Sequence, residues 1–122
     1  MTDSIAPPER LEDVFPVGEG PWVMVNLLRF RPGGGSKAYG KYATAFAKLL
    51  EEAGGRFLYR GRVGAAIIGG SEQWHAVALV EYPSREAFIR LIESDAYQAI
   101  HPHREDGLEA TRLLATQAYP TS

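Results

Sequence analysis

The sequence has no cysteine and no excess of charge of either sign. Without cysteine, the chain has no disulfide bond, no thiolate nucleophile and no cysteine-based metal site. Thirteen Lys and Arg residues stand against fifteen Asp and Glu residues, which gives a formal charge of −2, and no basic stripe stands out. Nucleic acids and anionic membranes bind basic surfaces, so we expect neither as a partner.

Long apolar runs are also missing. No stretch approaches the roughly 18 apolar residues that a membrane-spanning helix needs. The acidic start of the chain, MTDSIAPPERLEDVF, lacks the basic and apolar regions of a signal peptide. We therefore expect a cytoplasmic protein.

Residues that could hold a metal or a phosphate group are sparse. The three histidines are His75, His101 and His103. A zinc site needs three or four ligands, and two histidines flanking Pro102 are a weak signal for one. The PGGGSK segment at 32–37 lacks the spacing of a phosphate-binding loop. We therefore predict no metal and no cofactor.

The 122 residues are enough for one compact domain. We expect a lead-in segment at 1–21 with a short helix near Pro8, a domain at 22–118 and a tail at 119–122. Within the domain, apolar periodicity and turn residues predict a strand at 22–30, a helix at 37–53, strands at 56–68 and 74–82, a helix from Ser84 that restarts at Ser94 and is interrupted before Pro102, and a strand at 111–118. This order is the βαββαβ of a ferredoxin-like α+β fold with an antiparallel sheet.

Both faces of the strands at 22–30 and 74–82 are mainly apolar. Two helices can cover only one face of such a sheet, although an antiparallel sheet with one wet face should alternate apolar and polar residues. A second copy of the sheet, packed across a two-fold axis, would cover the other face, and the alternative is that the lead-in 1–21 folds over it. We expect a homodimer.

Three motifs resemble a family of small dimeric α/β-barrel proteins that carries the label "domain of unknown function". They are Asn26–Leu28 within VMVNLLRFR, the Ser-x-x-Tyr-Gln-x-Ile turn at 94–100, and Arg104, seven residues after the tyrosine. The resemblance covers residues 20–118 and implies a dimeric α/β barrel. Its wider superfamily includes cofactor-free monooxygenases, muconolactone isomerase-like enzymes and haem-binding chlorite dismutases, and we transfer no catalytic role from them. Many relatives have an acidic residue where this chain has Ala96.

An amide inside an apolar strand needs a hydrogen-bond partner. Asn26 lies between apolar neighbours, and an unpaired amide there costs about 1–3 kcal/mol. Its partner is either neighbouring backbone or a bound ligand, and we favour the ligand.

The other candidate site residues each have two interpretations. His75 and His101 are candidates to move a proton, although His75 also suits a hydrogen-bonded core position and His101 a helix cap near Pro102. Arg104 is either an anion clamp or a partner of helix-end carbonyls. Tyr39 and Tyr97 are most simply core residues, but a tyrosine hydroxyl at the rim of an apolar pocket can bind a ligand.

These residues favour an enzyme without a cofactor that acts on a small organic molecule between sheet and helices, in the manner of a monooxygenase or an isomerase. In this hypothesis Asn26 and Arg104 bind an enolate or carboxylate oxygen. The alternative is a small-ligand-binding or structural homodimer module without catalytic activity.

Overall fold

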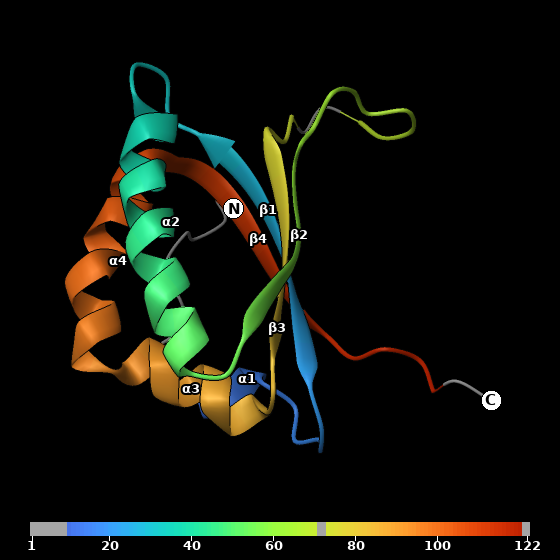
Figure 1. Ribbon diagram of the computed structural model, residues 1–122. Helices are drawn as coiled ribbons and strands as arrows, with labels where there is room; N and C mark the ends of the chain where they lie inside the picture. Colours follow the sequence, from blue (N-terminus) through green and yellow to red (C-terminus); the bar gives the residue numbers. More distant parts are fainter. Residues whose placement is uncertain (1–9, 71–72, 121–122) are drawn as a thin grey trace.

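The computed structural model describes residues 10–70 and 73–120. The elements, in chain order, are α1 (Leu11–Val14), β1 (Trp22–Phe30), α2 (Gly35–Glu52), β2 (Arg56–Arg62), β3 (Ala76–Tyr82), α3 (Arg85–Glu93), α4 (Asp95–Gly107) and β4 (Leu108–Thr116). The four strands form one antiparallel sheet in the order β2-β3-β1-β4, with the helices gathered on one of its faces (Figure 1). The predicted ferredoxin-like α+β fold is confirmed.

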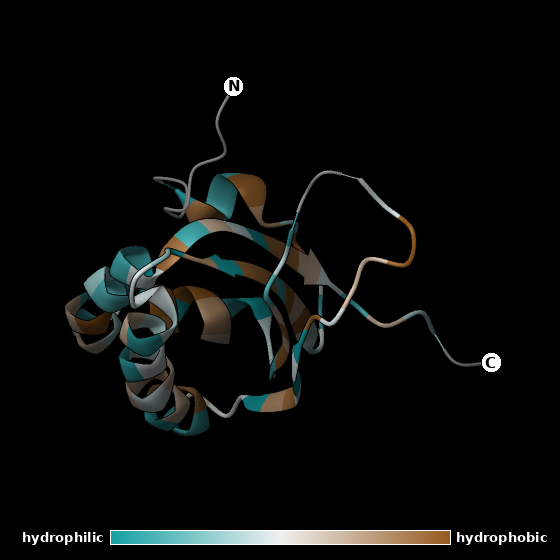
Figure 2. Cartoon of the chain, turned by 90° about the horizontal axis from the view of Figure 1, so that it is seen from above, coloured by the Kyte–Doolittle hydropathy of each residue, from teal (hydrophilic) through white to brown (hydrophobic). Residues whose placement is uncertain are grey.

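Side-chain alternation along β1 and β3 decides what each face of the sheet presents. Trp22, Met24 and Leu28 on β1 point to the helices and are buried, as are Val80 and Tyr82 on β3. Together with buried residues of α2, α3 and α4, they make the hydrophobic core. The core therefore lies between the sheet and the helix layer, which Figure 2 shows side by side as seen from above.

None of the helices in residues 10–70 and 73–120 covers the opposite face of the sheet, which we call the open face (Figure 1). The strand register places one continuous set of mainly apolar side chains on it: Val23, Val25, Leu27, Tyr59, Val77, Leu79 and Leu114. Tyr59 and Leu114 are more than half exposed, at 56% and 51%. The described part of the lead-in does not cover this face, because Phe15 packs on the helix side against Trp22 and Phe88.

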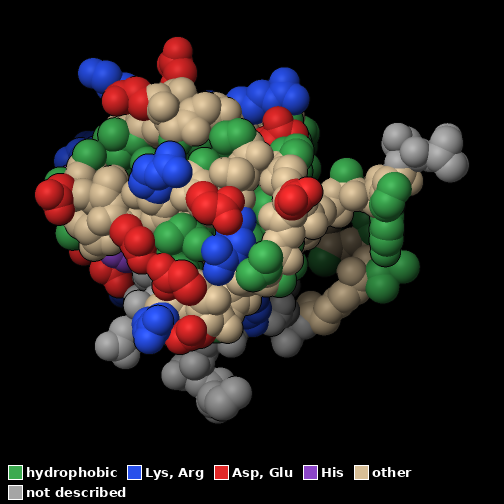
Figure 3. Space-filling view, turned by 90° about the horizontal axis from the view of Figure 1, so that it is seen from below, with side chains coloured by type: hydrophobic (Ala, Val, Ile, Leu, Met, Phe, Trp, Pro, Cys, Tyr) green, Lys and Arg blue, Asp and Glu red, His purple; other side chains and the backbone are tan. Residues whose placement is uncertain are grey.

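Polar caps and turns set the helix boundaries. Ser84 accepts a hydrogen bond from the Ala87 N–H and so caps α3, and Ser94 accepts one from the Tyr97 N–H and so caps α4. Gly54, with φ of 82°, follows α2 and turns the chain into β2. At the end of the molecule where α1 and α3 lie, acidic and basic side chains are interspersed (Figure 3), as the balanced composition predicts.

Several element boundaries differ from the sequence prediction. β2 ends at Arg62 rather than at 68, and residues 63–70 form a projecting loop in which Ile67 and Ile68 are 90% and 95% exposed. β3 begins at Ala76 rather than 74, β4 begins at Leu108 rather than 111, and the helix of the glycine loop begins at Gly35. The predicted short helix near Pro8 falls partly outside the described residues, and the helix observed there is Leu11–Val14.

The expected helix break before Pro102 is also wrong. Pro102 lies inside α4, although proline lacks the N–H that a helix interior uses. Buried side chains on both sides of the proline, Tyr97 before it and Arg104 after it, hold the helix in place. His101 therefore belongs to the middle of a continuous helix and does not cap one.

Candidate functional site

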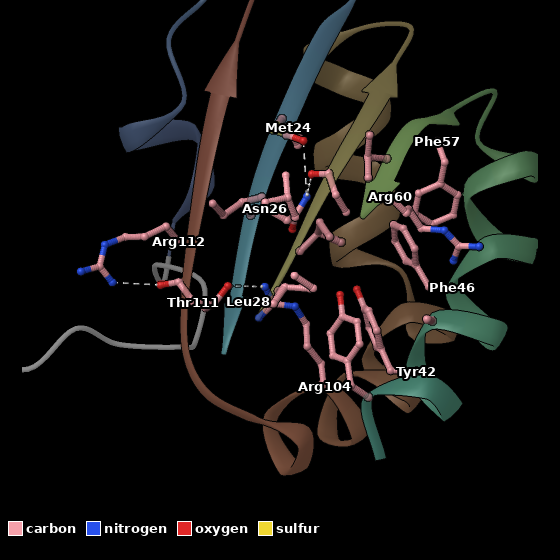
Figure 4. A pocket seen from close by; sticks show the side chains of 18 of the residues that line it. Met24, Asn26, Leu28, Tyr42, Phe46, Phe57, Arg60, Arg104, Thr111 and Arg112 are labelled. Atoms are coloured by element: carbon pink, nitrogen blue, oxygen red, sulfur yellow. Dashed lines mark hydrogen bonds between the residues drawn. The ribbon is translucent and has the colours of Figure 1, made fainter. Parts of the chain in front are cut away.

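A cavity of about 880 Å³ lies between the helix layer and the sheet. Its walls come from β1, β3, β2 and β4 on one side and from α2 and α4 on the other (Figure 4). Aromatic and aliphatic side chains dominate the lining, among them Met24, Leu28, Phe46 and Phe57. All six candidate residues from the sequence line it: Asn26, Tyr39, His75, Tyr97, His101 and Arg104.

Arg104 extends from α4 across the cavity toward β4 (Figure 4). Its side chain is charged, yet the residue is only 7% exposed. Arg104 Nη2 donates to Thr111 Oγ1 at 3.3 Å, and Thr111 Oγ1 donates to the Leu27 carbonyl at 2.9 Å. The guanidinium is therefore held at the sheet by a threonine that is itself fixed to the backbone of β1.

Two tyrosine hydroxyls meet in the cavity wall. Tyr42 from α2 and Tyr97 from α4 are hydrogen-bonded at 3.1 Å between their oxygens, and both residues are buried. Burial raises the pKa of both phenols, and Arg104 opposes this rise through its charge. Burial likewise raises the pKa of Tyr39, whose ring packs 5.3 Å from that of Tyr42. These phenols therefore stay neutral and act as hydrogen-bonding groups.

His101 connects the tyrosine pair to the surface. Its Nδ1 lies 3.2 Å from the Tyr97 hydroxyl oxygen, and its Nε2 lies 3.6 Å from Oε1 of Glu105 one turn further along α4. The His101 side chain is 13% exposed, whereas that of Glu105 is 40% exposed. Burial lowers the pKa of His101 and Glu105 partly counteracts this effect, so the ring is poised to gain a proton when an anion arrives nearby.

Asn26 lies on the helix side of β1 and faces the cavity (Figure 4). Its Nδ2 donates to the carbonyls of Met24 and Ala78 at 3.4 Å and 3.3 Å. The backbone therefore holds the amide nitrogen of Asn26, and the side chain lies in the lining of the cavity.

His75 lies at the mouth of the cavity, just before β3. Its Nδ1 accepts a hydrogen bond from the Phe30 N–H at 2.9 Å, and its ring stacks on that of Phe30 at 5.8 Å between centroids. The expected hydrogen bond is present, but the residue is exposed and not in the core, because β3 starts only at Ala76.

Sequence reasoning missed several residues of this site. Tyr42 was recognisable only as part of the apolar face of a helix, and Thr111 carried no pattern of its own. In the sequence, nothing distinguishes Arg60 and Arg62 from solvated surface charges, but the register places both on the helix side of β2, where they line the cavity. Alternation along β2 could not show this in advance, because the pairing with β3 shifts between Phe57 and Tyr59.

The charge of the cavity is one-sided. Its described lining contains no aspartate or glutamate, whereas Arg60, Arg62 and Arg104 lie on the helix side of the sheet. Arg112 also borders the cavity, but its side chain points away from it, toward the open face (Figure 4). Residues 10–70 and 73–120 contain no group of three or more His, Asp or Glu side chains that could hold a metal ion. In the same residues no helix is long and apolar enough to span a bilayer. The cavity is therefore suited to an organic ligand with negative charge.

A four-stranded antiparallel sheet with helices on one face is the fold of the dimeric α/β-barrel superfamily, and solved structures of that superfamily resemble this chain. A ferredoxin-like DABB family protein from Mesorhizobium loti matches with a TM-score of 0.63 at 14% identity, over 84% of this chain and 100% of that one. A candidate antibiotic-biosynthesis monooxygenase from Caulobacter crescentus matches with a TM-score of 0.65 at 16% identity, over 84% of this chain and 92% of that one. At such identity these likenesses concern the fold alone.

Residues 35–118 match the domain of unknown function DUF1330, and the chain belongs to that family. The protein RPA0582 of Rhodopseudomonas palustris, whose function is unknown, has 30% sequence identity to the chain and a TM-score of 0.90, over 98% of this chain and 100% of that one. No protein of curated function matches the sequence. The predicted resemblance is confirmed.

Proposed function

We propose that this protein is an enzyme without a cofactor that binds a small aromatic or conjugated organic anion in the cavity and transfers a proton to or from it. The observation that carries this proposal is the combination of an aromatic-lined cavity of about 880 Å³ with a buried arginine and no acidic group in the described lining. Pockets of roughly 300–1,000 Å³ with few polar groups are typical of small-molecule sites.

The polar residues divide into anion-binding and proton-moving groups. Arg104 binds a carboxylate, enolate or phenolate oxygen, and a buried guanidinium stabilises such charge far better than one in water. Asn26 orients the ligand through its Oδ1, and Tyr39 borders the same space. His101 is the proton-moving residue, and His75 at the mouth is the other candidate.

The proposal includes a homodimer formed through the open face. That face carries apolar side chains from all four strands, and a monomer rarely leaves so large an apolar patch exposed. An identical sheet packed across a two-fold axis would bury it.

A thermal-shift screen of small phenols, enols and aromatic carboxylates tests the binding site. Ligands of this class should raise the melting temperature of the protein, and Arg104→Met should abolish the rise for anionic compounds. If no compound of the class raises the melting temperature of the wild-type protein, the proposal is wrong.

A second measurement separates the enzyme from a non-catalytic binding module with the same cavity. Stabilising compounds should be incubated with the protein in deuterated water, and mass spectrometry should then detect deuterium at carbon positions next to a carbonyl. A rate of deuterium incorporation above that of the Arg104→Met variant supports catalysis by the wild-type protein. Binding without exchange supports the binding module.

A further inference from the structure

Four side chains form a continuous polar path from the cavity to the surface. Tyr42 lines the cavity and contacts Tyr97, Tyr97 contacts His101 Nδ1, and His101 Nε2 faces Glu105, at 3.1, 3.2 and 3.6 Å in turn. Tyr97 and His101 also line the cavity, whereas Glu105 is partly exposed to solvent. The path therefore begins next to Arg104 and ends at the surface.

We infer that this path removes a proton from the ionisable hydroxyl of a phenol or enol bound in the cavity. The inference rests on the proposed small-molecule site and makes its ligand class more specific. A carboxylic acid is already ionised at neutral pH and needs no base. A phenol or an enol still carries its proton, so a cavity that both binds an oxyanion and accepts a proton suits this class.

The surroundings of His101 give the path its direction. The Glu105 carboxylate beside Nε2 favours the tautomer that carries its proton there, which leaves Nδ1 as an acceptor. Tyr97 then donates to Nδ1, and Tyr42 donates to Tyr97. This arrangement leaves the lone pairs of the Tyr42 oxygen available to accept a proton from the ligand.

Proton removal proceeds by successive transfers. The ligand hydroxyl gives its proton to the Tyr42 oxygen, Tyr42 gives its own hydroxyl proton to the Tyr97 oxygen, and Tyr97 gives its proton to Nδ1 of His101. Each tyrosine gains one proton and loses one, so both are neutral before and after. The products are a ligand oxyanion beside Arg104 and an imidazolium beside Glu105, and no electron is transferred.

Electrostatics support this distribution of charge. Burial keeps the pKa of Tyr42 and Tyr97 high, so neither holds the negative charge. The other charged or titratable groups near the path are Arg104 on α4, Tyr39 on α2, Arg60 on β2 and Tyr82 on β3. The arginines favour the oxyanion, and Glu105 favours the imidazolium.

The probe for this path is 4-nitrophenol, whose phenol and phenolate forms absorb at different wavelengths. Its methyl ether, 4-nitroanisole, is a matched ligand without an ionisable proton. In the wild-type protein the bound 4-nitrophenol should remain phenolate at pH values where the free compound is protonated, because the proton stays within the complex on His101. The imidazole resonances of His101 should shift to the protonated form when 4-nitrophenol binds, but not when 4-nitroanisole binds.

His101→Gln and Tyr42→Phe should each raise the apparent pKa of the bound 4-nitrophenol by about one unit or more, a tenfold change in the phenolate fraction. His103→Gln makes the same substitution at an exposed position of the same helix and should leave the spectrum unchanged. If both compounds bind but neither variant alters the ionisation, the proton path is refuted and the cavity proposal stands. If neither compound binds to the wild-type protein, both proposals fail.

Discussion

Asn26 shows how one side chain can serve both the sheet and a cavity. Its amide nitrogen donates to backbone carbonyls of β1 and β3, and the residue also lines the cavity. The two hydrogen bonds, at 3.4 Å and 3.3 Å, are longer than the usual 2.9–3.0 Å of an N–H···O bond. The residue should therefore add only modestly to stability, and its place in the cavity lining is the basis for proposing that it orients a ligand.

Replacing Asn26 by leucine separates these two roles. Because the lost hydrogen bonds are long, Asn26→Leu should lower the free energy of unfolding by about 1 kcal/mol or less in urea titrations. The variant should also lose most of the rise in melting temperature that phenols give the wild-type protein. A loss of stability of about 3 kcal/mol with the ligand effect intact would instead assign Asn26 a purely structural role.

His101 should make the stability of the unliganded protein depend on pH. Burial lowers its pKa in the folded state below the ordinary value of about 6.5, so the unfolded chain binds more protons as the pH falls through this range. The contribution of His101 to stability is thus fully present above about pH 6.5 and is lost as the pH falls toward the folded-state pKa. His101→Gln should therefore reduce the loss of stability between about pH 7 and pH 5. Urea titrations at a series of pH values would measure this loss. An equally steep loss in the variant would show that His101 does not cause the pH dependence.

The sequence singled out candidate residues where chemistry and pattern coincided. Histidine, arginine and an asparagine inside an apolar strand are unusual enough to stand out, and all of them line one cavity. Tyr42 could not be singled out, because a tyrosine on the apolar side of a helix has the same pattern whether it is core or site. The partner of Tyr42 is 55 residues away, and only the packing of α2 against α4 brings the two hydroxyls together.

At the scale of elements, two glycines let α2 and the end of α4 approach closely. A Cβ added at Gly107 would lie 2.7 Å from the Gly35 carbonyl oxygen and 2.7 Å from the Tyr39 nitrogen, and one added at Gly35 would lie 2.7 Å from the Gly107 carbonyl oxygen. The Gly107 carbonyl also accepts a hydrogen bond from the Arg31 N–H. These are backbone atoms, so they cannot move aside as a flexible side chain could.

Gly107→Ala should therefore destabilise the protein by about 1–3 kcal/mol, the usual cost of overpacking. Gly40, within α2, has open space where a Cβ would be placed. Gly40→Ala should stabilise the protein by about 0.5–1 kcal/mol, because alanine favours a helix interior over glycine. Chemical denaturation of the two variants checks both signs, and equal effects would show that the close approach is unimportant.

The order of helices and strands was predictable because each element has its own apolar periodicity and is bounded by capping or turn residues. The predicted boundaries were wrong where local sequence preference and tertiary packing disagree. Pro102 signals a break, but the helix is held on both sides by buried residues. The apolar run at 65–68 suggests a strand, yet β3 ends its pairing with β2 at Arg62, and the run continues into an exposed loop.

At the scale of the whole molecule, the open face predicts the oligomeric state. The wild-type protein should have the mass of two chains in light scattering after size exclusion. Leu79→Glu places a charge in the centre of the open face, where burial would be costly, so this variant should have the mass of one chain. Val17→Glu, at a 90% exposed position, is the control and should remain dimeric, and a wild-type mass near one chain would overturn the homodimer.

The alternation along two strands already showed that both faces of the sheet are mainly apolar. It also predicted that a second copy of the chain packs on the face that the helices leave open. The cavity was not visible, because its existence depends on how far the helix layer stands from the sheet. Large aromatic side chains pack between the two layers, as Phe46 of α2 does against Phe57 of β2 with ring centroids 6.2 Å apart. Periodicity reports which side of an element faces inward, and not how much space remains there.

The two tryptophans lie on opposite sides of the same sheet. Trp22 is buried on the helix side and packs edge-on against Phe15, which lines the cavity. Trp74 lies between Arg29 and Arg112, at 5.9 Å and 5.3 Å from the guanidinium carbons, and the register places both arginines on the open face. Single-tryptophan variants would therefore give the protein two separate fluorescent reporters, one sensitive to events in the cavity and the other to association through the sheet.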